Sequence, residues 1–386
     1  MFALPKFITD ILDTLHTAGF EAFVVGGAVR DMLLGEKPSD FDITTSCPPE
    51  IIVTLFNKTV NTGIKHGTVT VVTECGNVEV TTYRRDVSYT DHRKPDNVDF
   101  ISNLYEDLKR RDFTVNAFAL SLDGNITDEF GGMQDLKDKI IRAVGVPEQR
   151  FFEDALRILR AFRFSAKLNF KIEQETLYAA LHSAHLLKNI SCERIFSELK
   201  QTIMSDHPEK IEPLINVGAF EHLHILKFEN SISLKCLPKN FKMRFFKFCQ
   251  LTGSNPLLVC KSLKVPNDLF DYCIDIQKLF ELNLDDDDIG IKIALNLVGE
   301  DILKDYYLLN RRSFERVDEI LSGNEPYKIS HLKVNGDDII GLSISGKNVG
   351  KVLEYLLNKV IKEPHLNQKE TLLLLAKEFI KTQCTI

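Results

Sequence analysis

The sequence has no apolar run as long as about 18 residues, the length of a membrane-spanning helix, so no segment is expected to cross a bilayer. Its first residues, MFALPKFITDILDTL, carry early acids and no small-residue cleavage site, so they predict an amphipathic helix and not a signal peptide. No internal repeat and no low-complexity segment is found. With 386 residues and 44% hydrophobic residues, the chain is expected to form roughly two to four domains.

The cysteines form no CxxC pair, so neither a zinc knuckle nor a disulfide framework is indicated. Scattered thiols of this kind are expected to be reduced, in a cytoplasmic protein. The eight positions are Cys47, Cys75, Cys192, Cys236, Cys249, Cys260, Cys273 and Cys384.

A positive net charge is also missing: the formal charge of −7 argues at first against a nucleic-acid partner. Net charge is a poor guide when the charges segregate, and here basic residues concentrate in 84–94, in 109–111 and at every third position from Arg157 to Arg163. The most acidic run, Asp285 to Asp288, is expected to be a helix start or a solvated loop. Charge alone therefore does not exclude RNA.

Residues 23–45 carry the densest chemical signal. An apolar run, residues 23–25, stops at Gly26 and Gly27, which suggests a buried strand entering a tight turn where the backbone can approach a ligand. Residues 28–34 then predict a short helix, and the free N–H groups at its start are a natural phosphate site. Arg30, in the first turn, could clamp a phosphate bidentately.

Asp40 and Asp42 follow in the same stretch. In an extended strand, residues i and i+2 share a face, so the two carboxylates would project together and repel each other unless a cation lay between them. Oxygen ligands with open positions suit Mg²⁺ that carries substrate phosphates. The alternative is a solvated DxD after a strand, turn and helix, but the spacing from the glycine turn favours a phosphoryl- or nucleotidyl-transfer site.

A hairpin is predicted over residues 68–80, with Cys75-Gly76-Asn77 as the turn. Glu79 falls on the opposite face from its neighbours Val78 and Val80. It is either a third carboxylate beside Asp40 and Asp42 or an ordinary exposed strand acid, and the pattern leaves both open.

Two further segments are rich in charge. Residues 84–98 predict a long loop of the kind that is usually functional or disordered. In KRRDFTVNAFAL, residues 109–120, Asp112 predicts the N-cap of a helix that buries 113–120. Arg110 and Arg111 would then stand at the positive end of that helix, which is unfavourable unless an anionic ligand binds there; a salt-bridged pair is the alternative.

Helical patterns dominate from about residue 147. FFEDALRILRAFRFSAKL predicts one amphipathic helix, on which Asp154, Arg157, Arg160 and Arg163 form a polar stripe with more charge than a simple salt bridge needs. Residues 206–325 carry no chemical motif. The segment 346–351, GKNVGK, is either a phosphate contact at a helix start or a turn with helix caps.

Five ordered motifs carry a family resemblance: GGAVRDMLLG with DFD, RRDFTVNAFA, DEFGGMQDLKDKIIRAVG, EDALRILRAFRFSAKL and SCERIFSEL. Over residues 20–205 the sequence resembles the class II CCA-adding enzymes (tRNA nucleotidyltransferases) and the bacterial poly(A) polymerases, of the polymerase-β nucleotidyltransferase superfamily. Residues 206–386 match only in length, helical character and glycine spacing. The resemblance implies an α+β nucleotidyltransferase head (1–145) followed by an all-α neck (146–205), body (206–325) and tail (326–386).

The resemblance also implies roles. Asp40 and Asp42 would be the catalytic Mg²⁺ ligands, and Asp154 and Arg157 would read the incoming base. The residues that would contact the nucleotide are Gly26, Gly27, Arg30, Arg111, Asp112, Asp154, Arg157, Arg160 and Arg163. The loop at 84–98, through Asp91 and Arg93, would move the templating helix between C and A geometries.

The template role has a chemical basis. Cytosine and adenine each present an amino donor beside a ring-nitrogen acceptor, whereas uracil and guanine present a carbonyl beside an N–H donor. A carboxylate and a guanidinium side by side therefore suit C and A and are mispaired with U and G.

The implied activity is addition of CCA to the 3′ end of tRNA from CTP and ATP, by a monomer or homodimer. Rival interpretations are a poly(A) polymerase, an enzyme that adds only CC or only A, and a non-catalytic RNA-binding protein. GIKHGTVTV, the retained Asp91 and Arg93, and the intact Asp40 and Asp42 favour the full reaction. No His-Asp pair occurs, so the phosphohydrolase domain of some relatives is not expected.

Overall fold

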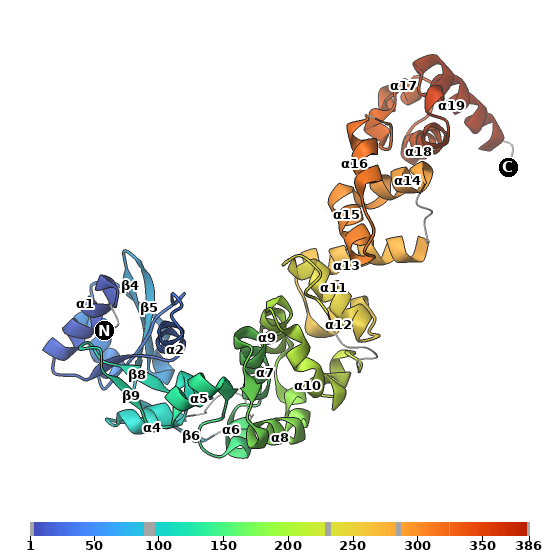
Figure 1. The fold of residues 1–386 in the computed structure, drawn as a ribbon. Coiled ribbons are helices and arrows are strands. Elements are labelled where there is room, and N and C mark those ends of the chain that lie inside the picture. The colour runs from blue at the N-terminus through green and yellow to red at the C-terminus, as the bar shows by residue number, and fades with distance from the viewer. Residues whose placement is uncertain (1–3, 89–96, 228–232, 283–286, 324, 384–386) are drawn as a thin grey trace. The chain divides into compact units, whose positions relative to one another are not determined.

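The computed structural model describes residues 4–88, 97–227, 233–282, 287–323 and 325–383 (Figure 1). Asp91, Arg93, Asp285, Asp286 and Cys384 lie outside these ranges, so the predictions made for them are not addressed. The chain divides into two compact units, Met1–Val265 and Pro266–Ile386. The boundary falls inside the segment predicted as the body, and the division into four parts stays a prediction.

The first unit begins with a seven-stranded mixed sheet of order β3-β4-β5-β2-β1-β8-β9. The β2–β5 pair is parallel and the other pairs are antiparallel. The strands are β1 (Ala22–Val25), β2 (Asp42–Thr45), β3 (Thr59–Gly63), β4 (Thr68–Thr73), β5 (Gly76–Thr82), β8 (Phe118–Leu120) and β9 (Ile126–Asp128). The predicted hairpin is confirmed as β4 and β5.

One face of this sheet carries the main core. Helix α1 (Lys6–Thr17) buries Ile8, Ile11, Leu12 and Leu15, the i, i+3, i+4, i+7 pattern of a single apolar stripe. This confirms the N-terminal amphipathic helix. Helices α2 (Gly27–Leu33) and α3 (Pro49–Leu55) contribute to the same buried cluster.

The opposite face is covered by α4 (Leu104–Lys109), whose Leu108 packs on Val25 and Ala119. Val25 and Asp42 are antiparallel partners, and partners in a ladder project to the same side of a sheet. The side chain of Asp42 therefore projects from the face of the sheet that α4 covers, and a site that uses this carboxylate lies on that face.

Residues 113–120 do not form the predicted helix. Thr114–Asn116 make one 3₁₀ turn, and Phe118–Leu120 form β8 between β1 and β9. A short run of apolar residues buried on both sides has no periodicity that separates helix from strand, and pairing with β1 decides the outcome.

The segment predicted as a loop over 84–98 is partly regular. Residues Arg84–Ser88 form β6 and Asn97–Phe100 form β7, an antiparallel pair. The ends of the segment are therefore strands.

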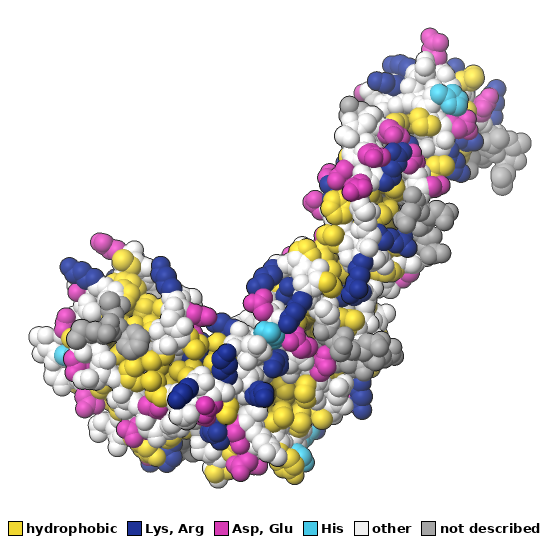
Figure 2. All heavy atoms as spheres, viewed as in Figure 1, with side chains coloured by type: hydrophobic (Ala, Val, Ile, Leu, Met, Phe, Trp, Pro, Cys, Tyr) yellow, Lys and Arg dark blue, Asp and Glu magenta, His cyan; other side chains and the backbone are white. Residues whose placement is uncertain are grey.

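The single helix predicted over 151–168 is two helices, α6 (Pro147–Glu153) and α7 (Leu156–Leu168), because Asp154 is extended at φ −140° and ψ 103°. In Figure 2 basic side chains gather over the part of this unit that contains α5 (Gly132–Asp138) and α6 to α9, with acidic ones among them. After the short pair β10 (Ile140–Ile141) and β11 (Lys171–Ile172), the described residues contain no further strand. The remaining helices of the unit are α8 (Gln174–His182), α9 (Cys192–Met204), α10 (Glu212–Asn216), α11 (Phe241–Leu251) and α12 (Pro256–Leu263).

The second unit is helical and has two buried apolar clusters. Asp287 caps α14 by accepting the N–H of Gly290, so a helix does start in the acidic run. The helices are α13 (Asn267–Leu282), α14 (Asp288–Val298), α15 (Glu300–Leu309), α16 (Glu315–Ser322), α17 (Gly336–Ile340), α18 (Lys347–Lys362) and α19 (Lys369–Gln383). Among all residues placed in the structure, no helix is both long and apolar enough to cross a membrane.

Candidate active site

Two carboxylates meet where β2 and β5 run side by side. Asp42 and Glu79 are register partners in this parallel pair, so both project to the same side, and both are exposed. Asp40 lies two residues before Asp42, just ahead of β2, and is also exposed. The sheet therefore brings Glu79 beside the predicted pair.

The carboxyl group of Asp42 is electrostatically unusual. Although the Asp42 side chain reaches the surface, the surrounding protein partly desolvates its carboxyl group, and this is the main reason that its pKa is raised to about 6. The charge of Arg111 lowers the pKa, and the charges of Glu79 and Asp40 raise it. A nearby cation would strongly stabilise the ionised form of such a carboxyl group. Hard carboxylate oxygens fit a divalent ion such as Mg²⁺. In the described part of the chain, no three His, Cys, Asp or Glu residues converge closely enough to hold a metal by themselves, so a ligand set would need substrate or water oxygens.

The glycine turn lies against Arg111. Gly26 has φ 74° and ψ −135°, and a Cβ there would lie 3.2 Å from Nη1 of Arg111. The Nε of Arg111 is buried and has no hydrogen-bond partner among the described residues. Burial lowers the pKa of Arg111, although the charge of Asp107 opposes this. A buried N–H without an acceptor next to a glycine turn fits an anionic ligand.

Asp107 organises this side of the site, and the sequence analysis did not find it. Its fully buried carboxylate accepts from Nη2 of Arg110 at 2.7 Å and from the hydroxyl of Thr44 at 3.0 Å, and lies 3.5 Å from Nη2 of Arg111. Burial raises its pKa, but the charges of Arg110 and Arg111 and these hydrogen bonds outweigh burial and lower it. The signal was an acid at i−3 and i−4 from two arginines on a helical turn.

Arg30 has a different environment from the predicted one. Its guanidinium is 3% exposed and donates to Oδ1 of Asp31 and, from Nη1, to Oδ1 of Asn116 at 2.6 Å. It lies beneath the turn, since Nη2 is 3.4 Å from the position of a Cβ on Gly27. In this geometry three of its N–H groups donate inside the protein and the side chain is almost fully buried, so the phosphate contact of Arg30 stays a prediction.

Asp112 is likewise internal. Its Oδ2 accepts from Nε of Arg160 at 2.7 Å, and its Oδ1 accepts from the amide of Asn116 at 3.1 Å. Although burial favours the neutral acid, the charge of Arg160 and these hydrogen bonds lower the pKa of Asp112 to about 2. Asp112 is therefore an ionised anchor for α7.

The N–H of Arg157 donates to the backbone carbonyl of Asp154 at 3.0 Å, but the side chains of the two residues have different partners. Asp154 accepts from Nη2 of Arg194 on α9 at 2.9 Å and from the N–H of Leu156. Nη1 of Arg157 donates to Glu153 at 2.7 Å, and its Nη2 donates to the carbonyl of Arg110 at 2.8 Å. Each side chain is thus held by its own partner, and Arg194, in SCERIFSEL, was not among the predicted site residues.

Arg160 and Arg163 differ in exposure. The side chain of Arg160 is one-third exposed, whereas Arg163 is buried and donates to Glu198 at 2.6 Å and to Gln201 at 3.1 Å, both on α9. Arg163, the last residue of the predicted polar stripe, is therefore buried between α7 and α9.

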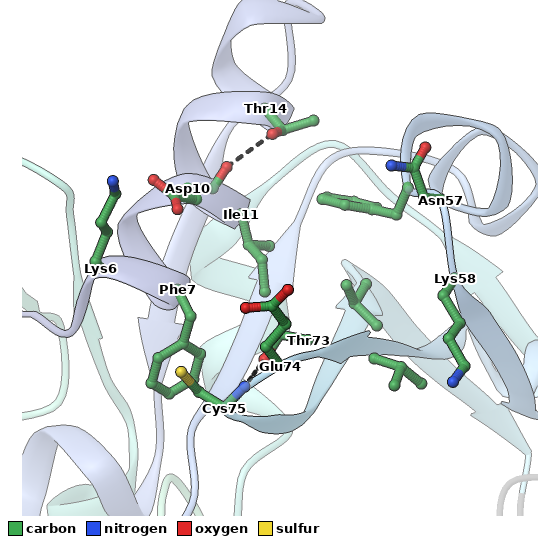
Figure 3. Close-up of a pocket in the computed structure, with 13 residues that line it drawn as sticks. Lys6, Phe7, Asp10, Ile11, Thr14, Asn57, Lys58, Thr73, Glu74 and Cys75 are labelled. Carbon is green, nitrogen blue, oxygen red and sulfur yellow. Dashed lines mark hydrogen bonds between the residues drawn. The ribbon is translucent and has the colours of Figure 1, made fainter.

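Two cavities lie away from these residues. One of about 510 Å³ lies between α1 and the β4–β5 hairpin, and its polar rim includes Lys6, Asp10, Lys58 and Glu74 (Figure 3). Another of about 360 Å³ is lined by Ser343, Asn348, Lys351 and neighbouring residues at the start of α18. Neither includes a predicted catalytic residue, and the phosphate contact of 346–351 stays a prediction.

A mixed sheet with clustered acids, a glycine turn and a buried arginine defines a nucleotidyltransferase head. Residues 22–142 match the family model described as "Poly A polymerase head domain", and residues 169–226 match "Probable RNA and SrmB- binding site of polymerase A". Such nucleotidyltransferases generally depend on divalent metals.

The chain belongs to the family of CCA-adding enzymes. It is 36% identical to the CCA-adding enzyme of Ligilactobacillus salivarius over 394 aligned residues, which cover 96% of each chain. It is 35% identical to that of Lactococcus lactis strain SK11, over 97% of this chain and 96% of that protein. The crystal structure of the Bacillus stearothermophilus CCA-adding enzyme in complex with CTP matches with a TM-score of 0.80 and 29% identity, covering 99% of this chain and 100% of that one.

Proposed function

We propose that this protein adds CCA to the 3′ end of tRNA, one nucleotide at a time, from CTP and ATP. The observation that carries the proposal is the register of Asp42 with Glu79 beside Arg111, in one unit with Asp154 and Arg157. The family supports the reaction, and the complex of the Bacillus stearothermophilus relative with CTP supports one of the two substrates.

Asp40 and Asp42 are the residues that would hold Mg²⁺, and Glu79 would add negative charge beside Asp42. When bound, Mg²⁺ would activate the attacking hydroxyl and neutralise the leaving group. The raised pKa of Asp42 and the proximity of Glu79 and Asp40 support this assignment, because clustered carboxylates are stabilised by a cation.

The triphosphate would lie against the glycine turn. The backbone of Gly26 and Gly27 is open to close approach, and Arg111 offers a buried, uncommitted Nε–H and a positive charge. Arg30 would support the turn from beneath. With the triphosphate held there, the 3′ hydroxyl of tRNA attacks the α-phosphate, a P–O bond forms, and pyrophosphate leaves.

Base selection would come from Asp154 and Arg157. The carboxylate of Asp154 would accept a hydrogen bond from the exocyclic amino group of C or A, and the guanidinium of Arg157 would donate one to the neighbouring ring nitrogen. Arg194 and Glu153 hold the two side chains before the nucleotide arrives, which reduces the ordering cost of recognition. Asp112 and Arg160 would set the position of α7 rather than touch the base.

The deciding experiment supplies the purified protein with tRNA that lacks its 3′ end, Mg²⁺, and each NTP singly or CTP with ATP, and resolves products to one nucleotide. Two additions with CTP, completed by one A when ATP is present, support the proposal. A long A tail would indicate a poly(A) polymerase, and a stop after CC would indicate a partial enzyme. The Asp42→Ala variant is the control and should add nothing. A cytoplasmic location and a monomeric or homodimeric state stay predictions.

A further inference from the structure

One buried amide connects the glycine turn to the templating helix. Oδ1 of Asn116 accepts from Nη1 of Arg30 at 2.6 Å, and Nδ2 of Asn116 donates to Oδ1 of Asp112 at 3.1 Å. The guanidinium of Arg30 lies under Gly27. The other oxygen of Asp112, Oδ2, accepts a hydrogen bond from Nε of Arg160 on α7 at 2.7 Å. The contacts run without a break from the turn that would hold phosphate to the helix that would read the base.

The chemistry of this position specifies an amide. The guanidinium on one side offers only donors, and the ionised carboxylate on the other offers only acceptors. A side chain between them must accept on one side and donate on the other, in that order. Asn116 is 5% exposed, so water cannot easily replace either bond.

The ring of Phe164 packs against three guanidinium groups in the same region. The ring of Phe164 is 6% exposed and lies 4.1 Å from the guanidinium carbon of Arg163, 5.1 Å from that of Arg30 and 5.2 Å from that of Arg160. Cation–π contacts with three guanidiniums restrain the arginines relative to one another. Arg30 and Arg160 are thus coupled twice, through Asn116 and Asp112 and through Phe164.

We propose that Asn116 is a positioning residue for nucleotidyl transfer. It touches no reacting atom; it holds Arg30 under the glycine turn and Asp112 with Arg160 on α7 in one fixed arrangement. Triphosphate and base, held by separate elements, are thereby aligned for attack. The inference rests on the proposed function and adds to it a residue that couples its two binding elements.

The sharpest test is Asn116→Asp in the full-length protein, which keeps shape but replaces the donor facing Asp112 with an acceptor. The charged groups around this position are Arg30 with its partner Asp31 from α2, Asp112 with Arg160 of α7, and, beyond Thr114 of the same turn, Asp135 of α5. The charges of Arg111, Arg157 and Arg163 also act on Asp112. Two adjacent buried carboxyls share a proton at low pH, and that proton restores a donor toward Asp112. The defect should therefore shrink as pH falls.

The expected result is a loss of kcat for C addition on the order of tenfold at pH 8, because small displacements of bound groups are costly. Relative to the parent enzyme at each pH, most of this loss should be recovered by pH 6. The KM for tRNA should stay unchanged. The melting temperature, read by circular dichroism, should fall below that of the parent as pH rises from 6 to 8, since a carboxyl with a raised pKa destabilises the fold once it ionises.

Two further variants complete the test. Asn116→Ala removes both bonds and should lose kcat equally at pH 6 and pH 8, with no recovery. Asn125→Asp is the matched control: Asn125 also donates to a carboxylate, that of Asp123, but on the exposed β8–β9 turn, and kcat should not change.

An active parent with an unaffected Asn116→Asp variant would overturn the inference. A loss that is the same at pH 6 and pH 8 in both Asn116 variants and follows only the folded fraction would also overturn it, because it would mark a purely structural residue. A parent that adds neither C nor A would overturn the proposed function and this inference with it.

Discussion

Asp42 on β2 and Glu79 on β5 are direct partners in the one parallel strand pair of the seven-stranded sheet. Their carboxylates leave the sheet on the same side, while Arg111 reaches the same place from the segment after α4. Thirty-seven positions of sequence separate the two acids, as the numbering shows. This relationship places Glu79 beside the proposed metal ligand Asp42, and the first three predictions depend on it.

The activity of the enzyme should fall in mild acid. The pKa of Asp42 is about 6, and only the ionised carboxylate binds a cation well, so kcat/KM should drop about tenfold between pH 7.5 and pH 5. Initial rates of C addition at low CTP and at one subsaturating Mg²⁺ concentration across this range check it, because saturating Mg²⁺ would displace the proton. A flat profile would contradict the environment described for Asp42.

The same raised pKa predicts an effect on stability in metal-free buffer. The folded-state pKa lies above the ordinary 3.8, so the stabilising contribution is present below that value and is lost as pH rises through 6. Asp42→Asn should therefore melt at a higher temperature than the parent at pH 8 and at a similar temperature at pH 4. Mg²⁺ should raise the melting temperature of the parent only. Equal melting curves at pH 8 would refute this.

Glu79→Gln should weaken metal dependence rather than nucleotide selection. The charge of Glu79 acts on Asp42, so its removal should raise the Mg²⁺ concentration for half-maximal activity about tenfold, while discrimination against UTP stays the same. The matched control is Glu74→Gln, an exposed acid of the same hairpin that lines the cavity of Figure 3. If both variants titrate like the parent, Glu79 is an ordinary exposed strand acid.

Arg157→Ala and Arg194→Ala should both relax base selection. In the proposed function Arg157 would donate to the base, and Arg194 donates to Asp154 at 2.9 Å, so each loss should raise UTP incorporation relative to CTP by about ten- to a hundredfold. Competition assays with single-nucleotide resolution measure this ratio. Glu193→Gln, on an exposed position of the same helix α9, should leave the ratio unchanged. Intact rejection of UTP by Arg157→Ala would eliminate the template assignment.

Gly132→Ala should destabilise the first unit. A Cβ at this position would overlap the carbonyl oxygen of Thr114 and would lie 2.7 Å from the ring of Phe118, and relieving such a clash costs about 1–3 kcal/mol. Gly350→Ala in α18, where a Cβ meets nothing within 4 Å, should instead be neutral or stabilise by about 0.5–1 kcal/mol. Urea unfolding of both variants gives the comparison. A parent-like midpoint for Gly132→Ala would show that the turn can shift without cost.

Local patterns were sufficient for much of the fold. The apolar stripe of α1, the glycine turn after β1 and the β4–β5 hairpin are each specified within a few residues, and all are confirmed. The order of five motifs was sufficient for the family. Asp40 and Asp42 were predicted from their spacing, whereas the roles of Asp154, Arg157 and Arg111 were implied by the family resemblance, and these assignments stay predictions.

Tertiary structure decided the rest. Residues 118–120 became a strand because β1 offered a partner ladder, and Asp154 became the break between α6 and α7. Arg30 turned inward because Asp31 and Asn116 satisfy its donors, and Asp154 is paired with Arg194, forty positions away, rather than with Arg157. Short local motifs of the sequence contain the types of residues that the chemistry needs. Which carboxylate meets which guanidinium depends on strand register and helix packing, and those are properties of the whole fold that no local pattern contains.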